Sequence, residues 1–149
     1  TRISLLLLYY NNVHLSFSDM ATVPNTFKGK KKGKVILTQY RVLFLTANRS
    51  DPMRSFSMPF QLIRGSNVEQ NLFSPNQVTG KIMAENGGGW EGTATFKLIF
   101  NSGGATEFMR LMALTPQFVG YMPPPPPPPG KSLRLLYSYH CQFHYNLHP

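Results

Sequence analysis

The densest group of residues able to do chemistry is a run of five lysines, Lys28, Lys30, Lys31, Lys32 and Lys34. An ammonium group near an acidic membrane surface contributes about 1 kcal/mol of attraction, so the run is a candidate site for lipid headgroups, phosphoinositides included. Arg49 and Arg54, after a predicted strand, are expected to reach the same end of the fold. The alternative is a solvated loop that keeps a charge-poor domain in solution. Direct, specific DNA binding is not expected, because no aromatic side chains alternate with these lysines.

A second group is a run of seven prolines, Pro123, Pro124, Pro125, Pro126, Pro127, Pro128 and Pro129. Such a run forms a polyproline II helix, which has little conformational entropy left to lose on binding. It therefore predicts a ligand for WW, SH3 or EVH1 domains, or for profilin. Lys131 and Arg134 lie nearby and supply the basic flank that favours SH3 docking. A stiff spacer is the alternative interpretation.

The sequence gives only weak signals for a metal site or a catalytic site. His140, Cys141, His144 and His148 have the side chains of metal ligands, but no acidic residue of the tail would orient them. A structural zinc site is therefore not expected. The six acidic residues are scattered singly, which predicts no carboxylate pair for acid–base catalysis. We expect no enzyme activity, no metal and no cofactor.

Length and composition limit the organisation of the chain. Its 149 residues allow one ordinary domain and a tail, and the formal net charge is +9. No apolar run approaches the roughly 20 residues that a membrane-spanning helix needs, so no transmembrane segment is expected. The predicted units are a domain over residues 1–115, a Pro-rich linker over 116–130 and a disordered basic and aromatic tail over 131–149.

Short stretches of alternating or β-branched residues predict about seven strands. They lie at residues 13–17, 34–38, 41–46, 55–58, 61–69, 78–84 and 93–100. One amphipathic helix follows them, since the apolar residues Ala105, Phe108, Leu111 and Met112 recur at helical spacing. Trp90 is expected to pack over a glycine-rich turn at one end of the core. Strands closed by one C-terminal helix predict a mainly β, pleckstrin-homology-like barrel or sandwich.

Several motifs occur in an order that resembles one known family. The two most specific are SFSMPF at residues 55–60 and GGGWEG at residues 87–92. Shorter matches are Phe27-Lys28-Gly29, Lys32-Gly33, Tyr40-Arg41-Val42, Phe96-Lys97-Leu98 and Glu107-Phe108. Over roughly residues 10 to 110 the chain resembles the N-terminal GRAM domain of the WW-domain-binding protein 2 family, which includes a sperm-specific relative. The resemblance implies a pleckstrin-homology-like GRAM fold.

The same resemblance implies a function. It points to a non-enzymatic intracellular adaptor and transcription coactivator that works through protein–protein binding, with transcription regulators and chromatin as partners and with cytoplasmic and nuclear locations. Members of the family bind WW domains through PPxY motifs, whereas no Pro-Pro-x-Tyr occurs in this sequence. The alternative function is a peripheral membrane module that binds phosphoinositides through the Lys28–Lys34 loop.

Overall fold

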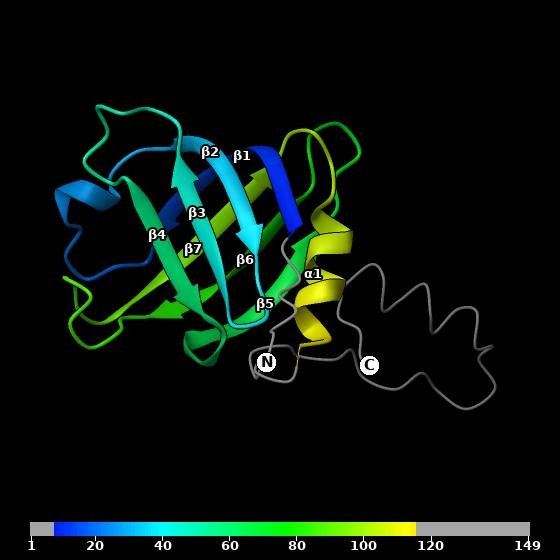
Figure 1. Cartoon of the computed structure of the whole chain (residues 1–149). Helices are drawn as coiled ribbons and strands as arrows, with labels where there is room; N and C mark the ends of the chain where they lie inside the picture. Colours follow the sequence, from blue (N-terminus) through cyan, green and yellow to red (C-terminus); the bar gives the residue numbers. More distant parts are fainter. Residues whose placement is uncertain (1–7, 116–149) are drawn as a thin grey trace, which may run out of the picture.

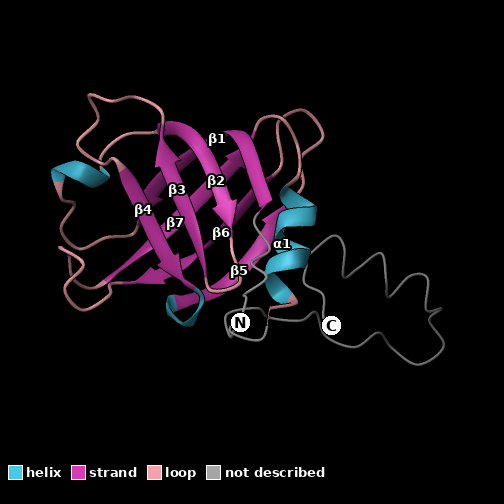
Figure 2. Ribbon diagram, in the orientation of Figure 1, coloured by secondary structure: helices cyan, strands magenta, loops and turns pink. Residues whose placement is uncertain are grey.

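The computed structural model describes residues 8–115, which form one antiparallel sheet and one C-terminal helix (Figure 1). The strands are β1 (Leu8–Ser18), β2 (Lys31–Leu37), β3 (Arg41–Thr46), β4 (Ser55–Pro59), β5 (Ile63–Glu69), β6 (Gln77–Met83) and β7 (Thr93–Phe100). Helix α1 spans Ala105–Ala113, and the 3-10 helices η1 (Asn25–Phe27) and η2 (Phe60–Leu62) lie in connections (Figure 2). The sheet order is β4-β3-β2-β1-β7-β6-β5. The predicted fold class is confirmed.

The predicted strands are present. Two begin three or more residues before the expected start, and the strand expected at residues 61–69 begins at Ile63, after η2. The strand expected at residues 13–17 begins at Leu8, and the strand expected at residues 34–38 begins at Lys31. The predicted hairpin of β2 and β3 is confirmed, since Leu37 pairs with Val42 across a short turn. In that turn the Thr38 hydroxyl accepts hydrogen bonds from the amides of Tyr40 and Arg41, at 3.0 Å each.

The core lies on the inner face of the curved sheet and beneath α1. Alternate residues of each strand point inward, as the pleat of a strand requires. In β7, for example, Ala94, Phe96, Leu98 and Phe100 are buried while the residues between them are not. The largest fully buried side chains are Leu15, Phe44, Met58, Phe60, Ile63, Ile82, Phe96, Leu98, Phe100, Phe108 and Met109.

Strand β1 contains a bulge that the sequence did not predict. Its register against β2 shifts between Tyr10 and Val13, and Asn12 has φ +59°. The loop after β7 fixes this bulge. The Asn12 carbonyl accepts hydrogen bonds from the Asn101 amide at 3.1 Å and from the Asn101 side chain at 3.2 Å, and the Asn12 side chain donates to the Ser102 hydroxyl at 3.1 Å. Bulges bend and re-aim a strand, and Tyr10, at one side of this bulge, contacts Glu107 and Phe108 of α1.

Helix α1 covers one opening of the barrel. Its buried residues are Ala105, Phe108, Met109 and Met112, whereas Leu111 is only half-buried. The predicted helix is confirmed, and three of the four predicted apolar residues are buried, with Met109 in place of Leu111 as the fourth. Tyr10 packs edge-on against Phe108, with ring centroids 5.5 Å apart, and its hydroxyl donates to the Glu107 carboxylate at 2.9 Å. Burial and this carboxylate raise the pKa of Tyr10, so the hydroxyl stays protonated.

Aromatic side chains fill the opposite opening. Phe27, from the connection between β1 and β2, packs against Phe17 and Trp90 with ring centroids 4.6 Å and 5.0 Å away. Phe56 completes the cluster. The predicted packing role of Trp90 is confirmed, because its half-buried ring joins the β6–β7 loop to this cluster. The β1–β2, β3–β4 and β6–β7 loops gather at this end of the barrel, away from α1 (Figure 1).

Candidate functional site

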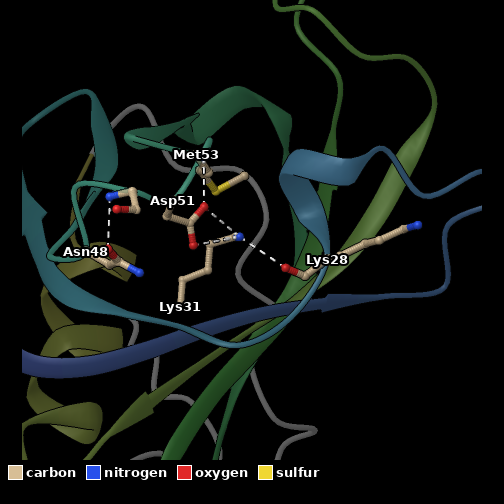
Figure 3. A network of polar contacts seen from close by, with 6 residues as sticks. Lys28, Lys31, Asn48, Asp51 and Met53 are labelled. Atoms are coloured by element: carbon tan, nitrogen blue, oxygen red, sulfur yellow. Dashed lines mark hydrogen bonds and ion pairs between the residues drawn. The ribbon is translucent and has the colours of Figure 1, made fainter.

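The candidate site is built around one ion pair inside the predicted lysine run. Lys31 Nζ lies 3.0 Å and 3.1 Å from the two carboxylate oxygens of Asp51 and donates to the Lys28 carbonyl at 3.1 Å (Figure 3). The side chains of Lys31 and Asp51 are 2% and 16% exposed. The Met53 amide also donates to Asp51, at 2.8 Å. The ammonium group therefore has three protein acceptors and almost no contact with water.

The start of β2 explains why this lysine points inward. Because β2 begins at Lys31, the alternation of the strand places Lys31, Val35 and Leu37 on the inner face. Partial burial acts to raise the pKa of Asp51, but the hydrogen bonds from Lys31 and Met53 and the charge of Lys31 outweigh it. The pKa of Asp51 is therefore lowered, which keeps its carboxylate ionised beside Lys31. Within the predicted lipid-facing set, the charge of Lys31 is therefore not available to a headgroup.

The ion pair joins two loops that carry the exposed basic residues. Asp51 belongs to the β3–β4 connection, whereas Lys31 begins β2 directly after the β1–β2 connection. Lys28 and Lys30 on one connection, and Arg49 and Arg54 on the other, are all exposed. We call these four residues the basic loop end. In Figure 3 the Lys28 ammonium group points away from the Asp51 carboxylate. The structure therefore presents these charges from two loops held together by Lys31 and Asp51.

The remaining two predicted residues, Lys32 and Lys34, lie elsewhere. Lys32 is exposed on β2 and pairs in register with His14 of β1. Lys34 is half-buried, and its ammonium group lies 5.3 Å from the centroid of the Tyr9 ring. Burial, together with the charges of Lys30 and Lys32, lowers the pKa of His14. Strand alternation thus divides the lysine run between the inner face, the outer face and the loop end.

The sequence did not reveal Asp51 as the partner of Lys31. Asp51 follows Asn48, Arg49 and Ser50 in a polar turn, where an aspartate normally faces water. In this turn the Asn48 side chain accepts a hydrogen bond from the Ser50 amide at 2.9 Å. Only the three-dimensional proximity of the two loops identifies the pair, and no local pattern signals it.

Other candidate groups are placed as follows. Within residues 8–115, no group of three or more His, Cys, Asp or Glu side chains could hold a metal ion. The tail residues His140, Cys141, His144 and His148, and the prolines Pro123–Pro129, lie outside the described residues. No helix in the described part of the chain is both long and apolar enough to span a bilayer.

Within residues 8–115, the order of the strands and helix α1 after them form a pleckstrin-homology-like fold with an exposed cationic end. A family model described as GRAM domain matches residues 10–115. The chain therefore belongs to the GRAM-domain family. Among solved structures, the Vps36 N-terminal PH domain aligns with a TM-score of 0.45 and 10% identity, over 69% of this chain and 72% of that one.

Named relatives are similar over the same region. WW domain-binding protein 2 from Homo sapiens is 50% identical over 107 residues, which are 72% of this chain and 41% of that protein. Postacrosomal sheath WW domain-binding protein from Homo sapiens is 51% identical over 102 residues, which are 68% of this chain and 33% of that protein. The predicted family resemblance is confirmed. The chain spans about two fifths of the first relative and a third of the second.

Proposed function

We propose that this chain is a non-catalytic adaptor whose GRAM domain attaches it to acidic membranes. The observation that carries the proposal is the basic loop end, in which four exposed cationic residues project from two loops joined by the Lys31–Asp51 pair. Loops held in place lose less conformational entropy when they meet a ligand, which favours binding. Phosphoinositides are the lipids that fit best, because their headgroups concentrate negative charge.

Sedimentation with vesicles tests this proposal. The variant Lys28→Glu/Lys30→Glu is compared with Lys81→Glu/Lys97→Glu, which makes the same change of charge at exposed positions on β6 and β7. Loss of two lysines near an acidic surface removes about 2 kcal/mol, so vesicles that contain a phosphoinositide should bind the first variant about 30-fold more weakly. Equal binding by both variants would contradict the proposal.

A second candidate function is supported by the names of the relatives. Because they are WW domain-binding proteins, we propose that this chain also binds a proline-recognition domain of the WW or SH3 type, through Pro123–Pro129. The corresponding cellular role is that of a transcription coactivator, which acts with transcription regulators in the cytoplasm and nucleus. Titration of labelled WW and SH3 domains with the full chain tests it. A saturable shift that a chain with alanines at Pro125–Pro127 does not produce would support the proposal, and no shift with either domain would refute it.

A further inference from the structure

A second candidate site lies on the outer face of the sheet, apart from the basic loop end. It is a shallow pocket of about 440 Å³ between the β1 bulge, β2 and the end of β3. Its polar lining comes mainly from Asn11, Asn12, Lys32, Lys34 and Thr46. The volume lies within the range of roughly 300–1,000 Å³ typical of small-molecule sites. The pocket is therefore larger than a single inorganic anion requires.

Strand geometry places the two lysines on the same side of this pocket. Residues two apart along a strand share a face and lie about 6.6–6.8 Å apart, so Lys32 and Lys34 both project outward while Lys31 projects inward. The Ala47 amide donates to the Lys32 carbonyl at 2.8 Å and closes the β3 side of the pocket. The backbone of β2 therefore sets the spacing of the two Cα atoms from which these side chains project.

The bulge supplies the amide side of the pocket. Asn12 is fixed by its hydrogen bonds to Asn101 and Ser102, and this leaves one N–H of its carboxamide unused. Within the described part of the chain, the exposed Asn11 side chain makes no hydrogen bond. Asn11 and Asn12 thus line the pocket together with Lys32 and Lys34. The Lys34 ammonium group lies 5.3 Å from the centroid of the Tyr9 ring.

The charged residues that line the pocket, Lys32 and Lys34, are both basic. No carboxylate lines it, and β1, β2 and β3 contain no acidic residue. In the connection that follows β3, the Asp51 carboxylate is paired with Lys31. His14, opposite Lys32, is the neighbouring titratable group on the outer face.

We infer that this outer pocket binds a phosphate monoester carried on a small polyol. The two ammonium groups would hold the phosphate dianion, and the carboxamides of Asn11 and Asn12 would hydrogen-bond to the hydroxyls of the polyol. A membrane headgroup and a free phosphorylated metabolite share this chemistry. The inference does not depend on membrane attachment through the basic loop end, because none of the four residues of that end lines the pocket.

Nuclear magnetic resonance titration of the full chain tests the inference. The probes are glycerol 3-phosphate, unphosphorylated glycerol, and phosphatidylcholine vesicles with and without a phosphatidylinositol phosphate. We expect saturable shifts of the Asn11 and Asn12 side-chain amides with the phosphorylated probes only. A response to glycerol 3-phosphate assigns a free ester as the source, and a response confined to phosphoinositide vesicles assigns a headgroup. No saturable shift with any phosphorylated probe would overturn the inference.

Two double variants that remove the same charge distinguish a specific binding site from general electrostatic attraction. Lys32→Gln/Lys34→Gln should weaken binding of the phosphorylated probe about tenfold or more, whereas Lys81→Gln/Lys97→Gln should leave it within about twofold. Asn11→Ala, which changes no charge, should weaken binding several-fold. Lys28→Glu/Lys30→Glu should reduce vesicle attachment but retain the amide shifts with glycerol 3-phosphate. Equal losses in the two glutamine variants would refute the pocket.

Discussion

Substitution of Asp51 by asparagine is the sharpest perturbation of the candidate site. The change keeps the size of the side chain and removes its charge, so the Lys31 ammonium group stays buried without a counterion. Lys31 is 2% exposed and retains only the Lys28 carbonyl and an amide oxygen as acceptors. Removal of one partner from a buried ion pair costs about 3–5 kcal/mol, and the 16% exposure of Asp51 places the expected loss near about 3 kcal/mol.

Urea unfolding of the full chain measures this loss. Trp90 is the single tryptophan of the sequence and lies in the aromatic cluster, so its fluorescence reports the folded state. The variant Lys31→Met/Asp51→Asn is the control, because it removes the uncompensated charge and should recover part of the stability. A loss below about 1 kcal/mol in Asp51→Asn, or a double variant less stable than the single one, would refute the role of the pair.

The same pair predicts an acid dependence of stability. Lys31 lowers the pKa of Asp51 in the folded chain, despite partial burial, whereas the unfolded value is about 3.9. Between these two pKa values the unfolded chain binds more protons, so stability rises with pH. The contribution of the pair is present above the unfolded pKa and is lost as pH falls through the folded pKa. The difference between the natural chain and Asp51→Asn should therefore be full at pH 6 and shrink below about pH 4.

Three further changes test the fold and the outer face. Gly33→Ala should destabilise the chain by about 1–3 kcal/mol in urea, because the added Cβ would lie 2.0 Å from the Leu45 carbonyl oxygen; a normal midpoint would contradict the register of β2 and β3. Lys32→Gln should raise the pKa of His14 in an imidazole titration by magnetic resonance, since a neighbouring positive charge is lost; an unchanged pKa would contradict their pairing. Phe27→Ala should cost about 3–5 kcal/mol and shift the tryptophan emission; unaltered emission would contradict the aromatic closure.

Much of the fold could be predicted because its signals are local. The SFSMPF motif alternates so that Phe56 and Met58 point inward, and Pro59 ends β4 at an edge of the sheet. The GGGWEG motif forms a turn, with positive φ at Gly87 and Gly89, and Trp90 then packs back onto the core. In each case neighbouring residues carry the information, so pattern and structure agree.

The candidate site could be predicted only in part, because its geometry depends on where one strand begins. The expected strand began at Lys34, which placed Lys31 in a solvated loop. The observed strand begins at Lys31, and its alternation directs that side chain inward. The sequence pattern of lysines and glycine is typical of a loop, and it is the pairing with β1 and with Asp51 that extends the strand. The bulge at Asn12 was missed for a similar reason, since contacts with the distant residues Asn101 and Ser102 hold it.

The most direct test of membrane attachment maps the contact surface residue by residue. Backbone resonances of the full chain are recorded with nanodiscs of phosphatidylcholine, with and without a phosphatidylinositol phosphate. We predict selective broadening of residues 28–30 and 49–54, with the strands β5 and β6 little affected. Broadening centred on β5 and β6, or no difference between the two lipid compositions, would contradict a membrane-binding basic loop end.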